Sequence, residues 1–336
     1  MDSLTQLALG ATVGEATLGR KVGNRAILWG AICGTIPDLD VFIPFGDPVK
    51  DFTYHRSFSH SFVVDLLLTP LIVWLILKLH PQTVPQRRGW MLMVYLALAT
   101  HALLDSFTVY GTQVFWPLST EPMTWSTIFI IDPAYTLPLL AGVTCALVAR
   151  RSGNFGHRAN AAGLVLSTLY LTWSVGAKLY VDGIARESLA AQNLPYGKLL
   201  SGPGPFNTVL WRVVAMDTES YYEGFYSLFD RQGSIRFARY PSQPRLLRAI
   251  EDHWPVRRLQ WFTNGFYSVS LEGNGIVMTD LRMGLEPGYV FRFRVGDQGN
   301  PHPRPLPAVR MPSVRQIERL PWVWERVWSE DAMWPR

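Results

Sequence analysis

Long apolar runs fill the first half of this chain of 336 residues and end near residue 182. Five of them, at about 26–45, 61–79, 90–108, 127–148 and 160–181, are candidate membrane segments. A spanning helix needs about 20 mostly apolar residues, and lipid leaves the backbone of any other open structure without hydrogen-bond partners. We therefore predict an α-helical membrane domain over residues 1–182. Its residues 3–19 form a shorter stretch rich in glycine and alanine, which predicts a short helix packed closely against the others.

The remainder of the chain, residues 183–336, has the composition of a soluble domain. Charged, proline and glycine residues become frequent there, and no run is long enough to cross a bilayer. Residues 208–215, 266–271 and 288–295 have strand patterns, residues 272–275 read as a turn, 243–253 show helical periodicity, and 300–312 resemble a proline-rich linker or tail. We expect a small α+β domain, mainly antiparallel. Its many tryptophans, at positions 254, 261, 322, 324, 328 and 334, fit core packing or a membrane-interface belt.

Charge and cysteine content exclude several functions. The formal net charge is +5, but lysine and arginine cluster beside the apolar segments, where they set topology, so we expect no nucleic-acid partner. Cys33 and Cys145 both lie within apolar runs, which argues against a disulfide or a cysteine metal site. The first residues lack the pattern of a cleavable signal peptide. The expected partner is membrane lipid, and the oligomeric state stays open.

Basic residues predict the orientation of the helices. They form three clusters: Arg20, Lys21 and Arg25; Lys78, Arg87 and Arg88; and Arg150, Arg151 and Arg158. If the apolar segments alternate in direction, all three clusters lie on one side, which the positive-inside rule makes cytoplasmic. Residues 46–60, residues 109–126 and everything after about 182 then lie outside. We expect a multi-pass membrane protein with an extracytoplasmic C-terminal domain, which is periplasmic if the source is a Gram-negative bacterium.

Acidic and histidine side chains collect at the outer end of these segments. They are Asp2, Asp38, Asp40, His55, His60, His101, Asp105 and Asp132. Because the topology rests on lysine and arginine alone, this common depth is an independent observation. A charged group inside a membrane segment costs roughly 2.5–3.5 kcal/mol and persists where it pairs, lines a wet cavity or binds a metal. We predict a metal site formed by four separate stretches of the chain.

Spacing supports this prediction. His101 and Asp105 are four residues apart and share one face of a helix. Asp38 and Asp40 would diverge on a regular helix, but Pro37 interrupts it and lets both turn toward one site. Imidazole and carboxylate ligands suit Zn²⁺, Mn²⁺ or Fe²⁺, with zinc the commonest in hydrolysis.

The candidate residues fall into three groups. The first-choice ligands are Asp38, His60, His101 and Asp105. Asp40 and His55 come next, and one of them could be a general base or could orient a ligand. Arg56 could hold a phosphate or carboxylate.

Several of these residues also have an ordinary interpretation. His101 and Asp105 could form an intramembrane hydrogen bond, and His55 and His60 could be interfacial loop residues. Asp132, just before a proline, is typical of a helix N-cap.

Two more charged residues have competing explanations. Arg56 could contact a lipid headgroup or pair with Asp51, and Asp65 fits a polar contact or pore-lining group better than a ligand.

Five short motifs carry a resemblance to a known family. They are Asp2-Ser3-Leu4-Thr5-Gln6 with Gly10, Gly34-Thr35-Ile36-Pro37-Asp38-Leu39-Asp40, His55-Arg56-Ser57-Phe58-Ser59-His60-Ser61, His101-Ala102-Leu103-Leu104-Asp105, and Tyr110-Gly111-Thr112. As a set they resemble the YdjM-type, LexA-regulated family of inner-membrane metal-dependent hydrolases over about residues 1–180. Many members have histidine where this chain has Gln6. The resemblance implies a ligand there, supplied by the amide oxygen of Gln6 or by Asp2.

Three functions fit these features. The first is a metal-dependent hydrolase at the outer face of the membrane, with a lipid-like, phosphate- or ester-bearing substrate because the site lies at headgroup depth. The second is a scaffold or sensor with a structural metal site. The third is an ion transporter, which needs polar groups in both halves of the membrane, whereas the inner half has few.

Overall fold

The chain forms two compact units in a computed structural model that describes residues 1–149, 153–313 and 320–332. The first unit contains Met1–Ile43, Tyr54–Val175 and Pro205–Asn207, and the second contains Pro44–Thr53, Gly176–Gly204 and Thr208–Arg336. Arg150, Arg151 and Trp334, which the sequence analysis named, lie outside the described residues.

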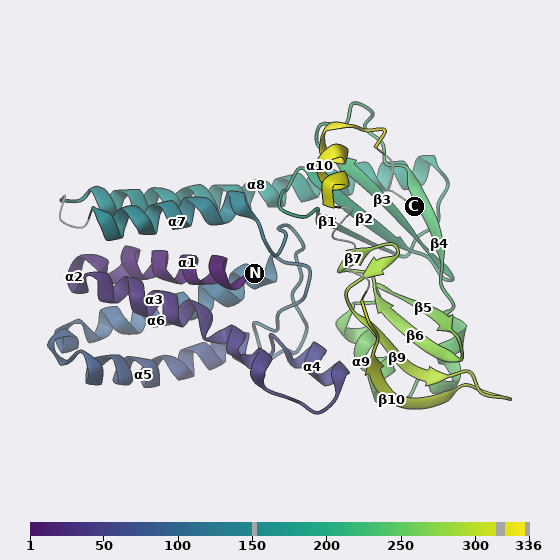
Figure 1. Cartoon of the computed structure of the whole chain (residues 1–336), viewed down its shortest axis with the longest axis horizontal. Coiled ribbons are helices and arrows are strands. Elements are labelled where there is room, and N and C mark those ends of the chain that lie inside the picture. The colour runs from purple at the N-terminus through teal and green to yellow at the C-terminus, as the bar shows by residue number, and fades with distance from the viewer. Residues whose placement is uncertain (150–152, 314–319, 333–336) are drawn as a thin grey trace. The chain divides into compact units, whose positions relative to one another are not determined.

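The first unit is built from helices (Figure 1). They are α1 (Ser3–Gly14), a π-helical turn (Glu15–Gly19), α2 (Arg20–Val22), α3 (Asn24–Thr35), α5 (Phe62–Leu79), α6 (Arg87–Ser106), α7 (Pro133–Val148) and the first part of α8 (Phe155–Ala191). Short 3-10 helices occur at Pro37–Phe42, Phe58–His60 and Pro81–Gln86. The helical turns between α1 and α3 and between α5 and α6 lie at one end of this unit in Figure 1, where α7 ends and α8 begins.

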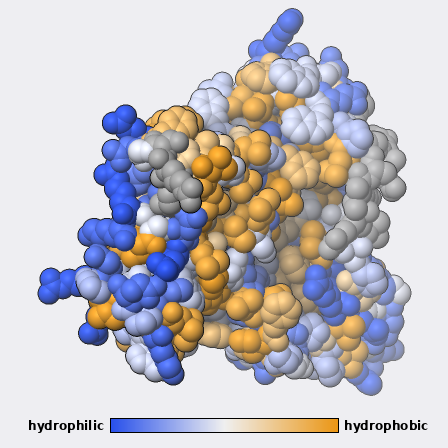
Figure 2. All heavy atoms as spheres, turned by 60° about the vertical axis from the view of Figure 1, so that its left-hand side comes forward, coloured by the Kyte–Doolittle hydropathy of each residue, from blue (hydrophilic) through white to orange (hydrophobic). Residues whose placement is uncertain are grey.

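Three of the described helices are long and apolar enough to cross a membrane, at Phe62–Leu79, Pro81–Ser106 and Phe155–Ala191. The apolar helix α7 is shorter, at 16 residues. Residues 26–45, predicted as one segment, instead contribute to the 12-residue α3 and the 3-10 helix that follows Pro37. Exposed apolar side chains cover wide areas of the surface in Figure 2, as lipid-facing helices require. The prediction of a helical N-terminal region with candidate membrane-spanning helices is thus confirmed, while the count of five spans stays a prediction.

Helices α1 and α3 pack with their backbones in contact. A Cβ atom on Gly10 would lie 2.2 Å from the carbonyl oxygen of Gly30, and one on Gly34 would lie 2.5 Å from that of Gln6. Gly10 and Gly14 on one helix face Gly30 and Gly34 on the other, so each helix has the small-residue spacing of close membrane packing. Because of this contact, Gln6 of α1 lies beside Gly34 of α3.

The second unit contains two four-stranded antiparallel sheets. The first has the order β1-β2-β3-β4, formed by Lys198–Pro203, Leu210–Met216, Ser220–Ser227 and Phe237–Pro241. The second has the order β10-β9-β6-β5, formed by Arg304–Arg310, Arg292–Asp297, Gly275–Asp280 and Tyr267–Glu272. Smaller elements are the β7–β8 pair (Gly284–Leu285, Gly288–Tyr289), α4 (Pro48–Tyr54), a 3-10 helix (Pro244–Ile250), α9 (Trp254–Phe262) and α10 (Leu320–Trp328). The predicted antiparallel domain is confirmed.

Some details of this unit differ from the sequence-based expectations. The turn at 272–275 does join β5 to β6, with Glu272 opposite Gly275. The helical periodicity over 243–253 corresponds to a 3-10 helix, and the regular helix α9 starts only at Trp254. The proline-rich stretch is not merely a linker, because Arg304–Arg310 pairs with β9 as a strand at the edge of the sheet, where proline is tolerated.

The segment Pro44–Thr53 belongs to the second unit because of aromatic packing. The ring of Phe52 lies 4.8 Å from that of Phe262, 4.3 Å from Phe291 and 5.3 Å from Phe293, measured between centroids. Such clusters stabilise a core beyond the area that they bury.

Candidate metal centre

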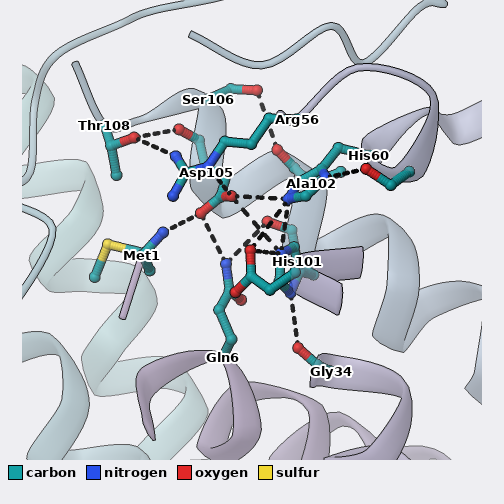
Figure 3. A network of polar contacts seen from close by, with 12 residues as sticks. Met1, Gln6, Gly34, Arg56, His60, His101, Ala102, Asp105, Ser106 and Thr108 are labelled. Atoms are coloured by element: carbon teal, nitrogen blue, oxygen red, sulfur yellow. Dashed lines mark hydrogen bonds and ion pairs between the residues drawn. The ribbon is translucent and has the colours of Figure 1, made fainter. Parts of the chain in front are cut away.

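Two histidines and two aspartates meet in the helical unit. His101 and Asp105 come from α6 and His60 from the 3-10 turn before α5 (Figure 3). Asp38 comes from the 3-10 helix after α3. One ligand atom from each of these four residues lies within 4.8 Å of the other three. The structure therefore brings together the four residues that the sequence analysis placed first.

The hydrogen bonds of His101 determine which ring nitrogen faces this cluster. Its Nδ1 lies 2.7 Å from the carbonyl oxygen of Gly34, which can only accept a hydrogen bond, so Nδ1 carries the hydrogen. In the neutral ring Nε2 then has a lone pair, and this atom lies 3.1 Å from Nε2 of His60.

The separations between the four ligand atoms fit one small cation. His60 Nε2 lies 3.5 Å from Asp38 Oδ1 and 3.2 Å from Asp105 Oδ2, and His101 Nε2 lies 3.5 and 3.7 Å from the same two atoms. Bonds of about 2 Å around a tetrahedral ion place its ligands roughly 3.3 Å apart. Lone pairs that face one another at these distances need a positive charge between them, and a divalent metal ion meets that need.

Positive charge is also favoured at His60 itself. Burial alone lowers the pKa of this imidazole, but hydrogen bonds to Asp105 and Asp38 outweigh burial and raise the pKa above its usual value. A metal ion would therefore compete with a proton for the same place.

Asp105 is the most heavily supported carboxylate of the cluster. Its Oδ1 accepts a hydrogen bond from Gln6 Nε2 at 2.9 Å and contacts the Met1 amino group, and its Oδ2 lies 3.0 Å from Nε of the buried Arg56 (Figure 3). Arg56 also donates to Thr108 Oγ1 at 3.1 Å. Arg56 thus neutralises the charge of Asp105.

The alternative pairing of Arg56 with Asp51 is wrong. The carboxylate of Asp51 accepts a hydrogen bond from the backbone nitrogen of Phe45 at 2.8 Å, while Arg56 pairs with Asp105. Pairing inside the helical unit satisfies a buried carboxylate, which gains more from a counter-charge than an exposed one does.

Asp40 lies on the Nδ1 side of His60, away from the Nε2 atom that faces the cluster, and His55 pairs with Asp40. Asp40 accepts from His55 Nδ1 at 2.7 Å, from the backbone nitrogen of Arg56 at 3.0 Å and from the hydroxyl of Ser59 at 2.5 Å. Burial alone raises the pKa of Asp40, but the hydrogen bonds from His55 and Ser59 outweigh it and lower the pKa. These contacts place Asp40 beside a ligand, 3.8 Å from His60 Nδ1.

The remaining candidate residues have other places. Asp2 is the N-cap of α1 and accepts from the backbone nitrogens of Leu4 and Thr5. Gln6 does face the cluster, but its amide nitrogen rather than its oxygen points to Asp105. Asp132 caps α7, as the N-cap interpretation predicts, and Asp65 is buried in α5 outside the four-residue cluster.

Comparison with known proteins finds a family that matches the helical part of the chain. The model of the family described as YdjM inner membrane protein matches residues 1–181, more than half of the 336 residues. The chain belongs to the YdjM family. All four residues of the cluster lie within the matched region, and the resemblance to the YdjM family found from the motifs is confirmed.

Two relatives with curated descriptions support membership of the YdjM family. The inner membrane protein YbcI of Escherichia coli (strain K12) is 29% identical over 181 residues, which cover 52% of this chain and 92% of YbcI. The protein YfhP of Bacillus subtilis (strain 168), described as uncharacterized, is 28% identical over 150 residues, 43% of this chain and 45% of YfhP. The match to YfhP thus spans less than half of that relative. No solved structure matches the chain.

Sequence reasoning missed two groups that hold the histidines. Ser59 and the carbonyl of Gly34 each contact an Nδ1 atom. Both lie inside the motifs that were noted, but a hydroxyl or a backbone carbonyl has no distinctive pattern, and only the tertiary contact shows its role.

Proposed function

We propose that this protein is a membrane-bound, metal-dependent hydrolase whose centre lies at the outer face of the bacterial inner membrane. The observation that carries the proposal is the set of facing lone pairs on Asp38, His60, His101 and Asp105, at separations that suit one ion. Zinc is the first choice, and manganese or iron are alternatives. Gln6, beside Asp105, is the residue best placed to add a fifth contact if its amide turns.

The partial exposure of one ligand favours catalysis over a structural metal site. The side chains of His60, His101 and Asp105 are fully buried, whereas that of Asp38 is 21% exposed. A catalytic ion needs an open position, and this position would lie on the Asp38 side. The bound ion would supply Lewis acidity, which polarises a phosphoryl or acyl oxygen and lowers the pKa of a bound water toward about 7.

The chain's own residues would hold the substrate and move the proton. His55 and Asp40 are hydrogen-bonded to each other behind His60, so either is a candidate general base. Arg56 balances the charge of Asp105, and its guanidinium, with Nε 3.0 Å from Asp105 Oδ2, could also attract a phosphate.

Exposed apolar residues beside Asp38 favour a lipid-like substrate. Leu39, Val41 and Phe42 share its 3-10 helix and are 55%, 64% and 78% exposed. In a membrane protein such side chains fit the acyl region, with Asp38 and Asp40 turned inward. An amphiphile with a phosphate or ester group at headgroup depth would then reach the metal from the lipid.

One observation favours the transport alternative. Glu15, in the π-helical turn after α1, is buried, and its carboxylate lies 3.6 Å from Nδ1 of His157. Gln6 lies near the start of α1, whereas Glu15 follows the end of α1. If the start of α1 faces outward, Glu15 and His157 are polar groups in the inner half of the membrane, where the sequence analysis expected few. A transporter would move metal ions or protons across proteoliposomes, whereas a hydrolase would not.

The first test measures the metal content of the purified protein. We expect about one equivalent of Zn²⁺, Mn²⁺ or Fe²⁺ in the wild type and a loss of it in His101→Ala with the fold retained. His80→Ala is the matched control, because His80 packs on Trp29 away from the cluster. Equal metal content in wild type and His101→Ala, or none in either, would contradict the site.

Activity is then measured on chromogenic phosphomonoesters, phosphodiesters and carboxylic esters, each with a short and a long acyl or alkyl chain. A metal-loaded protein that hydrolyses none of them would support the scaffold or sensor alternative.

A further inference from the structure

A series of hydrogen bonds connects the ring of His55, 22% exposed, to the buried ring of His60. His55 Nδ1 lies 2.7 Å from Asp40 Oδ1, and Ser59 Oγ lies 2.5 Å from Asp40 Oδ2 and 2.9 Å from His60 Nδ1. His60 Nε2 is the atom that faces the cluster. An unbroken series of contacts therefore joins the partly exposed His55 to His60, a candidate metal ligand.

The Ser59 hydroxyl can donate one hydrogen bond, and its contacts determine which group accepts it. An ionised carboxylate only accepts, and Asp40 already accepts from the backbone nitrogen of Arg56. Ser59 therefore donates to Asp40 and presents lone pairs to His60. Nδ1 of His60 then carries a hydrogen, and Nε2 is left free to bind a cation. His101 reaches the same state through the carbonyl of Gly34.

We propose that Ser59, held by Asp40, is a positioning residue that fixes the ring orientation and tautomer of His60 for metal binding. The inference rests on the proposed metal site, although the hydrogen bonds themselves need no metal. Residues that orient a metal-binding histidine in this way typically change metal affinity by about 10–100-fold when they are lost.

The first experiment titrates the purified, metal-free protein with Co²⁺ and follows its absorption spectrum. We expect Ser59→Ala to bind about 10–100-fold more weakly than the wild type. Ser59→Thr keeps a hydroxyl and should restore most of the affinity. Ser57→Ala is the matched control, because Ser57 is buried in the same loop but donates to the carbonyl of Tyr54. Equal affinity of Ser59→Ala and the wild type would overturn the proposal.

The second experiment reads the tautomer of His60 without any metal. The ¹⁵N resonances of the histidine side chains are recorded while the pH is raised, until those of His60 no longer change and its ring is neutral. We expect the Nδ1–H form in the wild type and in Ser57→Ala. In Ser59→Ala the acceptor at Nδ1 is lost, and the proton should move to Nε2, which faces Asp105 at 3.2 Å.

The two experiments separate failure of this inference from failure of the proposed function. A wild type that binds no Co²⁺ would contradict the metal site, and the resonances of His60 would still decide the role of Ser59. A wild-type His60 with its proton on Nε2, or a tautomer unchanged in Ser59→Ala, would overturn the positioning role.

Discussion

The charge of Arg56 matters most when no metal is bound. Its Nε lies 3.0 Å from Oδ2 of the fully buried Asp105. Removal of one partner of a buried ion pair costs about 3–5 kcal/mol, because the other charge is left without compensation. We therefore expect Arg56→Met to lower the thermal stability of the metal-free protein strongly and to lower it less when Zn²⁺ is present. Arg56→Lys should lose less thermal stability than Arg56→Met, both with and without Zn²⁺.

Thermal unfolding in detergent, with and without Zn²⁺, measures this difference. Arg158→Met is a suitable control, because Arg158 is exposed at the start of α8 and should contribute little. The interpretation fails if Zn²⁺ protects the wild type and Arg56→Met equally.

At this same scale, sequence could predict the ligands better than the groups around them. His101 and Asp105 were recognisable because a four-residue spacing places both on one helix face, and a charged pair inside an apolar run needs a reason. Gln6 and Asp2 are close in sequence, yet one faces Asp105 and the other caps α1. Which of two neighbouring polar residues turns inward depends on where a helix begins, and sequence places that boundary poorly.

At the scale of elements, the contact between α1 and α3 controls the geometry of the centre. A Cβ atom on Gly30 would lie 2.2 Å from the carbonyl oxygen of Gly10, so the two helices would have to separate. Gly34, one turn later, holds His101, and Gln6 of α1 contacts Asp105. We expect Gly30→Ala to lower both thermal stability and Co²⁺ affinity.

Gly176→Ala is the matched control for this substitution. A Cβ atom at Gly176 would have no neighbour within 4 Å, so alanine there should be neutral or stabilise α8 by about 0.5–1 kcal/mol. Thermal unfolding and Co²⁺ titration of both variants test the idea. If Gly30→Ala retained the affinity of the wild type, close packing of α1 on α3 would not position the centre.

The elements themselves were predictable to different degrees. Hydropathy located α5 and α6 because long apolar helices have no alternative in lipid. It merged α3 with the 3-10 helix after Pro37, since both are apolar and only the break at the proline separates them. The sequence around strand β10 was interpreted as a linker or an extended tail, because proline is uncommon in strands except at the edge of a sheet.

At the scale of the whole chain, no pattern in the sequence predicted that Pro44–Thr53 would belong to the second unit. This segment lies between two parts of the helical unit, and its membership depends on Phe52, whose partners follow more than 200 residues later. Nonlocal aromatic packing of this kind has no local signature.

The last prediction concerns which side of the membrane each part occupies. The loop between α5 and α6 is flanked by Lys78, Arg87 and Arg88, so the positive-inside rule places it in the cytoplasm. The second unit follows α8 and should lie outside. A cysteine introduced at the exposed Asn274, in the turn between β5 and β6, should then react with a membrane-impermeant maleimide on intact spheroplasts. A cysteine at the exposed Gln82 should react only after lysis. The wild type is the blank, because Cys33 is buried and Cys145 lies within the apolar helix α7. The reverse pattern would place the metal centre on the cytoplasmic face, because His60, in the 3-10 turn just before α5, and His101, toward the end of α6, lie at the opposite ends of these helices from this loop. The substrate would then have to come from the inner leaflet or the cytoplasm.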